Sequence, residues 1–404
     1  MKHRSSLAAA GKKFRTKNIS RRVRQIVISP IKEMSILADL EEGKRGPKII
    51  SFGQGIPYFD TPPLIKTAIK KALQEPDTAK YTLEPGITEL RELIARDLKR
   101  RKKIKGIKPK KEVMVSSGCQ EAVACALATV IDPGDQVLLP EPAFASHIEQ
   151  ILQWGGKPVF VPLHEKNGWA LNVKECEKRI TKKTKAILFS NPSNPTGAVF
   201  GKKEMIELAK FAKRKNLIII TDETYDFLTY GGAKHFSPAS ISLVRDRVIL
   251  CGSFSKKYAM TGYRVGFAYA DEGIIDHMLK VHDALQICAP AISQKAAMAA
   301  LRGPQTSVRD FVKKLSENRR LMCRELDKLS DYFEYQKPMG AYYIMVKVKK
   351  PKMNSFKLAL KILREARVIT IPGAAFGPSG EGHLRFSFAG RPEDIREGFR
   401  RLNK

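Results

Sequence analysis

The 404-residue sequence lacks any apolar run that approaches the roughly 20 residues of a membrane-spanning helix, so we expect a soluble protein. It has no CxxC pair and only six scattered cysteines, which favours reduced thiols in the cytosol over a disulfide framework or a zinc site. No internal repeat is apparent. The composition, with 43% hydrophobic residues, 28 Gly and 23 Pro, is that of a globular protein and excludes disordered, collagen-like and coiled-coil chains.

Acidic residues are also scarce. The chain has 41 Asp plus Glu against 73 Lys plus Arg, a formal net charge of +32, which favours anionic partners such as nucleic acid, anionic membrane or small acidic substrates. The most basic run, KRRKKIKGIKPKK (Lys99 to Lys111), contains no aromatic residue. Because nucleic-acid binding uses stacking aromatics or a recognisable module, we interpret this run as a solvated helix end and loop and expect no specific nucleic-acid partner.

Residues 1–30 contain no acidic residue at all. Their Arg- and Ser-containing composition suits either a disordered solubilising tail or an organellar transit peptide, and the sequence leaves both open. The long apolar segment of a secretion signal is missing. We therefore expect a cytoplasmic protein, with organellar targeting as the alternative.

Between Val113 and Ala270, short apolar segments alternate with segments of helical periodicity. The apolar segments are rich in Val, Ile and Leu, which is typical of strands buried on both faces. They are VMVSS, QVLLP, PVFVPL, AILFS, LIIITD, RVILCG and RVGFAYA. The alternation predicts the α/β class, with a mostly parallel central sheet sandwiched by helices.

A chain of 404 residues is too long to form a single compact core. After Pro304 the predicted order of helices and strands changes. A long charged helix over residues 305–329 is followed by strands YYIMVKV and HLRFSFA and by helices near 355–366 and 393–402. We predict a basic, disordered tail (1–30), an N-terminal arm that packs with the small domain (31–52), a large domain (53–303) and a small α+β domain (304–404).

Polar residues follow several of the predicted strands, and in an open α/β sheet the carboxyl ends of the strands form the binding site. Ser117, Gly118 and Cys119 make a glycine turn that opens a helix, where free N–H groups suit a phosphate. Asp222 ends a fully apolar strand, and a buried carboxylate needs a cationic or N–H partner. The other strand ends are followed by Phe144, Asn194, Tyr225, Lys256 and Arg264. Together these groups predict a site for a phosphorylated aromatic cation such as pyridoxal 5′-phosphate (PLP).

A series of motifs extends from residue 53 to residue 389. It consists of GxGxPxFDTP (Gly53 to Pro62), KYxxxxG (Lys80 to Gly86), SGCQEA, NPxNPTG, DxxY, SxSKxxxxxGxRxG and RFSFA. In order and spacing the series resembles the fold-type-I PLP-dependent aminotransferases, class I of the aspartate aminotransferase superfamily. The resemblance runs from about residue 50 to the C-terminus. It implies PLP as the cofactor and a homodimer with shared active sites.

The resemblance implies the residues that bind the cofactor. Lys256 corresponds to the residue that forms the internal aldimine, and Asp222 to the partner of the pyridinium nitrogen, which makes the ring a better electron sink. Tyr225 and Asn194 correspond to donors to the phenolic oxygen of the ring, and Phe144 to the aromatic that stacks on it. The phosphate contacts correspond to Ser117, Gly118, Cys119, Ser253, Arg264 and, from the neighbouring subunit, Tyr81.

The resemblance also implies how substrate is bound and converted. Arg385 corresponds to the arginine that binds the substrate α-carboxylate, a role that suits its planar, bidentate guanidinium, and Gly55 and Asn194 assist it. The freed amine of Lys256 removes the Cα proton and returns it to the C4′ carbon of the cofactor. Lys257 lies one place off the pattern and is expected to be solvated. The implied reaction moves the amino group of an L-α-amino acid to a 2-oxo acid such as 2-oxoglutarate.

Departures from the family pattern bear on the donor. Ile56 and Tyr58 replace acids that the family often has, and Cys119 stands where some dicarboxylate-specific relatives have a lysine. Aspartate, aromatic and aliphatic donors therefore stay open. A β-lyase or a cyclopropane-forming synthase of the same fold is the alternative, because fold and cofactor do not determine the reaction. A nucleic-acid-binding regulator is disfavoured, since the roughly fifty residues before the core show no helix-turn-helix pattern.

Overall fold

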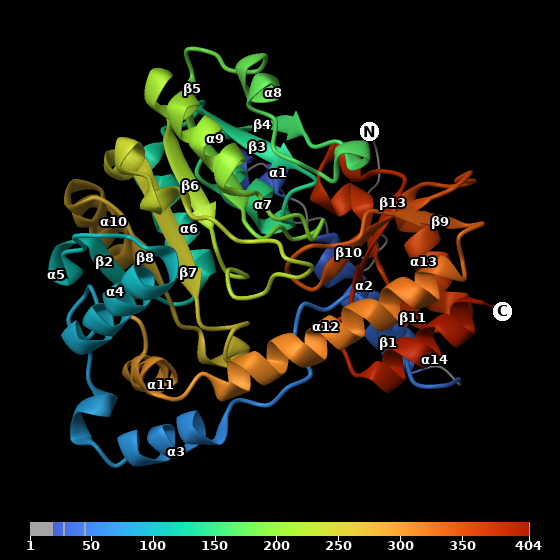
Figure 1. Ribbon diagram of the computed structural model, residues 1–404, viewed down its shortest axis with the longest axis horizontal. Helices are drawn as coiled ribbons and strands as arrows, with labels where there is room; N and C mark the ends of the chain where they lie inside the picture. Colours follow the sequence, from blue (N-terminus) through green and yellow to red (C-terminus); the bar gives the residue numbers. More distant parts are fainter. Residues whose placement is uncertain (1–18, 27–28, 44–45, 404) are drawn as a thin grey trace.

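The computed structural model describes residues 19–26, 29–43 and 46–403. Its centre is a sheet of seven strands in the order β2-β8-β7-β6-β5-β3-β4 (Figure 1). The strands are β2 (Val113–Ser116), β3 (Gln136–Glu141), β4 (Lys157–Pro162), β5 (Thr184–Ser190), β6 (Ile218–Asp222), β7 (Val248–Ser253) and β8 (Gly266–Tyr269). Each predicted apolar segment overlaps one of them. Only β8 runs antiparallel to its neighbours, so the predicted mostly parallel sheet is confirmed.

Both faces of the inner strands are buried. Successive residues belong to different apolar clusters: Ile187 and Ile219 lie in one, and Leu188 and Ile220 lie in the other. Such alternation follows from the two-residue period of a strand with helices on both sides. The expectation of burial on both faces is wrong for β4, an edge strand whose residues are mostly half-exposed.

Helices cover the two faces of the sheet (Figure 1). One face packs against α6 (Cys119–Val130), α7 (Ala145–Gln153) and α10 (Glu272–Gln286). The other packs against α4 (Thr88–Lys102), α9 (Lys202–Arg214) and α11 (Ala291–Arg302). The described chain has three further α-helices in this part: α3 (Pro63–Ala72) and the short helices α5 (Pro109–Glu112) and α8 (Val173–Glu177).

A second sheet of four antiparallel strands lies beside the first. Its order is β12 (Ile371–Pro372), β13 (His383–Ser387), β10 (Tyr343–Val348) and β9 (Phe333–Tyr335). The long helix α12 (Thr306–Asp327) runs from the large sheet to this small one, where α13 (Ser355–Ala366) and α14 (Pro392–Leu402) pack (Figure 1). The helices and strands predicted after Pro304 are therefore confirmed within a few residues of their expected ends.

Both chain ends contribute to the smaller part of the molecule. Strand β1 (Ile50–Ser51) pairs in parallel with β11 (Val368–Ile369), and α2 (Pro30–Glu42) contacts β11, β12 and α13. Phe52 lies between the rings of Phe386 and Phe399, at centroid distances of 5.7 and 5.5 Å. Gly398 permits this approach, because a Cβ atom there would clash with the Phe52 ring. The boundaries of the four predicted regions stay a prediction.

The predicted disordered tail is described only in part. Residues 1–18 and 27–28 lie outside the described residues. The remainder differs from the expectation at α1 (Arg21–Gln25), a short helix that contacts α7. Arg and Gln are good helix formers, so local propensity and this contact account for the helix. In the described ranges, no helix combines the length and the apolar character needed to cross a membrane.

Replacing Phe52 by Ala should destabilise the protein, because it removes a buried ring that joins the N-terminal segment to β13 and α14. We expect the free energy of unfolding to fall by about 3–5 kcal/mol. Urea unfolding followed by circular dichroism measures this change. Phe52→Leu retains most of the buried volume and should lose less; equal stability of the two variants would contradict the packing described here.

Candidate active site

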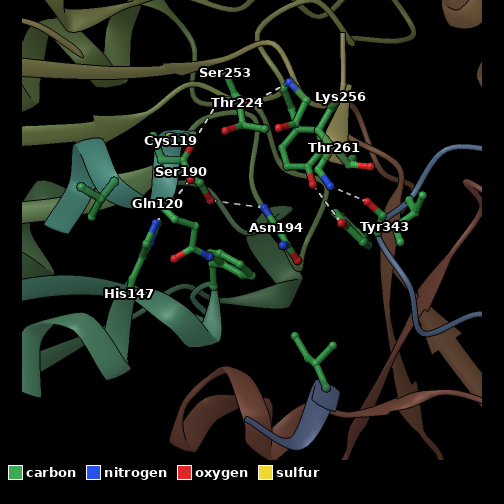
Figure 2. Close-up of a pocket in the computed structure, with 18 of the residues that line it drawn as sticks. Cys119, Gln120, His147, Ser190, Asn194, Thr224, Ser253, Lys256, Thr261 and Tyr343 are labelled. Carbon is green, nitrogen blue, oxygen red and sulfur yellow. Dashed lines mark hydrogen bonds and ion pairs between the residues drawn. The ribbon is translucent and has the colours of Figure 1, made fainter. Parts of the chain in front are cut away.

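The carboxyl ends of the parallel strands open into a cavity of about 420 Å³ between the large sheet and the small one. Figure 2 shows Cys119, Asn194, Lys256 and Tyr343 around it. The cavity is lined by ten of the predicted site residues: Gly55, Cys119, Phe144, Asn194, Asp222, Tyr225, Ser253, Lys256, Arg264 and Arg385. Chain segments that are up to 330 residues apart in sequence therefore meet at one place.

One end of the cavity has groups that suit an anion. Helix α6 begins there at Cys119 without a side-chain cap, so its first N–H groups are available, and Gly118 adopts a φ of +87°. A Cβ atom at Gly118 would lie 2.5 Å from Arg264 Nη2. Arg264 donates hydrogen bonds to the carbonyls of Ser117 (3.3 Å) and Thr261 (3.1 Å), and within the described chain no carboxylate pairs with it. A helix N-terminus with an unpaired arginine suits a phosphate.

Asp222 lies at the end of β6, where it accepts hydrogen bonds from the Thr224 N–H (3.0 Å) and the Cys119 Sγ (3.3 Å). His147 Nε2 lies 3.4 Å from its other oxygen. Burial raises the pKa of Asp222, but the interactions with His147 and Thr224 outweigh burial and hold the pKa below its ordinary value. The site therefore contains a buried carboxylate in its charged form, ready to pair with a protonated nitrogen.

Lys256 follows β7, and its Nζ donates a 2.6 Å hydrogen bond to the carbonyl of Gly55. Burial, with the positive charges of Arg264 and Arg385, lowers the pKa of Lys256 to about 8. A lysine with this pKa is in part a neutral amine near physiological pH, and a neutral amine can act as a nucleophile or as a base.

Arg385 forms a second anion site on the other side of the cavity. It is 1% exposed, and its guanidinium lies between the rings of Tyr343 (4.5 Å) and Phe376 (4.9 Å). It donates to Asn194 Oδ1 (3.0 Å) and to the carbonyl of Gly53 (2.5 Å), while Nε has no hydrogen-bond partner. No carboxylate of the described residues pairs with Arg385. A buried cation without a counter-charge requires an anionic ligand.

Two tyrosine hydroxyls meet beside Lys256 and Arg385. The hydroxyls of Tyr225 and Tyr343 are 2.8 Å apart, and Tyr342 donates to the carbonyl of Gly55 at 2.7 Å. Burial and the neighbouring tyrosines raise the pKa of Tyr225 well above its ordinary value. Tyr225 therefore stays protonated and can donate a hydrogen bond to a ligand oxygen.

Three predicted residues lie outside the cavity lining. Ser117 and Gly118 border it, since the Ser117 carbonyl accepts from Arg264 and Gly118 precedes α6. Tyr81 is 77% exposed and does not line the cavity of its own chain. Its predicted role in a neighbouring subunit is not tested by a single chain.

Sequence reasoning missed His147 and Tyr343, both of which line the cavity. A signal for His147 was available, because it follows Phe144 by three residues at a helix start and therefore lies on the same side. The two rings are 5.4 Å apart. Tyr343 begins an apolar strand, and nothing in that pattern distinguishes it from a core residue. Gln120, Ser190, Thr224, Ser255 and Thr261 were also missed.

Two expectations about lysines are wrong. Lys257 is not solvated: it is 5% exposed, its Nζ lies 3.8 Å from Asp97, and burial together with Arg101 lowers its pKa to about 8. The basic run 99–111 is not uniformly solvated either. Lys102 is buried and Arg101 is half-buried, because acidic side chains from the segment after β6 reach the end of α4.

The predicted absence of a zinc site rested on cysteine spacing alone. The structure brings Glu121, Cys125 and His282 together, with ligand atoms within 4.8 Å of one another. His282 Nδ1 and Glu121 already form a 2.6 Å hydrogen bond, and the second Glu121 oxygen accepts from the Ser117 N–H. This arrangement supports the turn at Ser117 through ordinary hydrogen bonds.

The lowered pKa of Lys256 can be tested by competitive acetylation of the cofactor-free protein, with peptide mass spectrometry to resolve Lys256. Because the neutral amine reacts, we expect labelling to rise with pH around a midpoint near 8. Arg264→Gln removes a nearby positive charge and should raise this midpoint. A midpoint near the ordinary value of 10.5 would contradict the described environment.

Comparisons with known proteins agree with this geometry. The family described as Aminotransferase class I and II matches residues 47–402. The chain is 38% identical over 374 residues to an aspartate aminotransferase of Pyrococcus abyssi, covering 92% of this chain and 95% of the relative. It is 37% identical over 374 residues to aromatic-amino-acid aminotransferase 2 of Thermococcus litoralis, covering 92% and 95%.

A solved structure shares the fold. The crystal structure of an aromatic aminotransferase from Pyrococcus horikoshii superposes with a TM-score of 0.85 at 37% identity, and covers 92% of this chain and 97% of the other. The predicted fold-type-I architecture and the predicted enzyme class are thereby confirmed. The chain belongs to the class I and II aminotransferases, a PLP-dependent family of transaminases.

Proposed function

We propose that this chain binds PLP in the described cavity and transfers the amino group of an L-α-amino acid to a 2-oxo acid, with 2-oxoglutarate as the acceptor. One observation supports the proposal above all: two cationic groups without carboxylate partners in the described chain, Arg264 and Arg385, line the cavity together with Lys256. Transamination requires two anionic groups to be bound near the same lysine: the phosphate of the cofactor and the carboxylate of the substrate.

The residues present fit PLP. The Ser117–Cys119 turn, Ser253 and Arg264 would hold the phosphate, and Asp222 would hold the proton on the ring nitrogen. Phe144 would pack against the ring from the His147 side. When bound, PLP supplies an electron sink for the charge that develops on the substrate Cα.

The chain's own groups would bind the substrate and move its proton. Arg385 and Asn194, already hydrogen-bonded to each other, would bind and orient the α-carboxylate. Lys256 Nζ, with a pKa near 8, would take the proton from Cα and deliver it to the C4′ carbon of the cofactor. The Tyr225 hydroxyl would donate a hydrogen bond to the phenolic oxygen of the cofactor.

The mouth of the cavity favours donors with an uncharged, apolar side chain. Ile31 of α2 and Ile56 line it, and Ile56 is 53% exposed. The cationic side chains that line the cavity in the described chain are Lys256, Arg264 and Arg385, and each already has a proposed role. The side-chain carboxylate of a dicarboxylate, whether aspartate or the acceptor 2-oxoglutarate, would need a further cation, which the proposed second subunit would supply. Aromatic and aliphatic donors need no such cation and are therefore proposed in addition to aspartate.

A homodimer with shared active sites is also proposed. Tyr81 and Leu83 are 77% and 71% exposed on the single chain, a high exposure for large apolar side chains. A second copy that covers this segment would bury both side chains and place Tyr81 at the partner's phosphate. The proposed compartment is the cytosol, in keeping with six free and buried cysteines.

A half-reaction tests the proposal. The PLP-loaded protein is mixed with single L-amino acids in the absence of any oxo acid, and the visible cofactor band is followed. We expect conversion to the pyridoxamine form with aromatic and aliphatic amino acids, and reversal by 2-oxoglutarate. Release of ammonia and pyruvate without an acceptor would contradict transamination, and the absence of a visible band would contradict PLP binding.

Arg385→Ala should raise KM for every donor, because the lost contact is with the α-carboxylate that all amino acids share. A charge-assisted hydrogen bond of about 1.5–3 kcal/mol corresponds to a rise of roughly 10- to 100-fold. Steady-state kinetics with at least two donors measures it, and Arg400→Ala on the exposed face of α14 is the control. An effect confined to one donor would instead indicate that Arg385 binds the side chain of that donor and not the α-carboxylate.

A further inference from the structure

The proposed cofactor and substrate residues Asp222, Tyr225 and Lys256 are each followed directly by a charged residue that avoids the cavity. These following residues join a group of six buried or half-buried charged side chains, which we call the ion cluster. Its members are Asp97, Arg101, Lys102, Glu223, Asp226 and Lys257. In each of these three places, one residue lines the cavity and the next residue in the sequence belongs to the ion cluster.

Lys102 lies at the centre of the ion cluster. It comes from the end of α4, and its side chain is 2% exposed. Its ammonium donates a 2.5 Å hydrogen bond to Glu223 and also pairs with Asp226. Ser237 donates to the second oxygen of Glu223 at 2.6 Å. Lys102 thus ties both carboxylates of the segment that holds Asp222 and Tyr225 to a helix of the large domain.

The other members extend the cluster to the Lys256 turn. Arg101 donates to Asp226 at 3.1 Å and to Asp97 at 2.7 Å, and Asp97 lies 3.8 Å from Lys257 Nζ. Asp97, Arg101 and Lys102 belong to one helix, so α4 contacts the segments after β6 and after β7 together.

The six members comprise three carboxylates and three cations, and Arg100, an exposed arginine of the same helix, also pairs with Asp97 at 2.9 Å. His235, whose Nε2 lies 3.3 Å from Glu223, adds no charge at neutral pH, since burial and the charge of Lys102 lower its pKa to about 4. Buried ion pairs are weak contributors to stability, but removal of one partner leaves an uncompensated charge that must move or recruit a counter-ion. Buried ion pairs can hold chain segments in one arrangement, and reacting groups need a fixed arrangement.

We propose that the ion cluster is a positioning device for the reaction, in which Lys102 holds the segments that present Asp222, Tyr225 and Lys256 to the cofactor. The proposal rests on the proposed function, because it takes the roles of these three residues from it. It also gives part of the basic run 99–111 an internal partner, acidic side chains of the same chain, in place of nucleic acid or solvent. Lys102 is a positioning residue and touches neither cofactor nor substrate.

Lys102→Met tests the proposal in the PLP-loaded, full-length protein. Lys99→Met, an exposed lysine of the same run, is the matched control, and Lys102→Arg is the conservative variant. The readouts are the maximum rate and KM of the half-reaction, the melting temperature, and the pH at which the visible cofactor band changes. The last readout reports the electrostatic environment of the bound cofactor, which a loss of stability alone does not change.

We expect Lys102→Met to lower the maximum rate by about 10- to 100-fold, with KM within about threefold, because Arg385 lies outside the ion cluster. The band transition should move to higher pH by about one unit, since loss of a positive charge favours the protonated form. Lys102→Arg should recover part of the rate. If Lys102→Met does not fold, Asp226→Asn is measured instead. It should lower the maximum rate to a smaller extent and move the band transition to lower pH, since loss of a negative charge favours the deprotonated form.

Variants that melt earlier but react and titrate like Lys99→Met would overturn the proposal and leave the ion cluster a purely structural feature. This outcome is distinct from failure of the proposed function, in which the unmodified protein itself would show no half-reaction. An active unmodified protein with a slow, spectrally shifted Lys102→Met variant would support both.

Discussion

Parallel pairing of β5, β6 and β7 is the constraint on which the site depends. In the observed register Ser190 lies opposite Asp222, and Asp222 lies opposite Cys251, so the three strands end side by side. The loops that follow must then leave the sheet at one edge, and they contain Asn194, Tyr225 and Lys256. The cavity exists because neighbouring parallel strands end together with their chains directed away from the sheet.

Electrostatics then determines what this edge can bind. The large sheet contributes Arg264 and the start of α6, and the small sheet contributes Arg385 from β13. Both arginines lack carboxylate partners in the described chain, while Asp222 is the charged acid between the strand ends. The Arg385 contact with Gly53 also links β13 to the N-terminal segment, so the substrate site and the packing of the smaller part depend on the same residues.

Much of the fold was predictable, and the reason lies in periodicity. Continuous apolar segments such as LIIITD and AILFS predict strands that are buried on both faces. The polar and glycine residues that follow each strand indicate where the candidate site lies. Contacts that depend on the relative placement of elements were not predictable. The pairing of His147 with Asp222, the position of Tyr343 beside Arg385, and the burial of Lys102 within a run of solvated lysines all require the tertiary structure. The hydrophilic sequence around Lys102 predicts exposure, because its acidic partners lie more than a hundred residues away in the sequence.

The central claim is that the cavity binds PLP with Lys256 as its covalent partner. Reduction of the PLP-loaded protein with borohydride, followed by proteolysis and peptide mass spectrometry, tests it most directly. The neighbouring Lys257 provides an internal comparison, because burial lowers the pKa of both lysines to about 8 while only Lys256 lines the cavity. The account predicts a phosphopyridoxyl group on Lys256 and none on Lys257. Attachment to Lys257, or to no lysine in this segment, would contradict it.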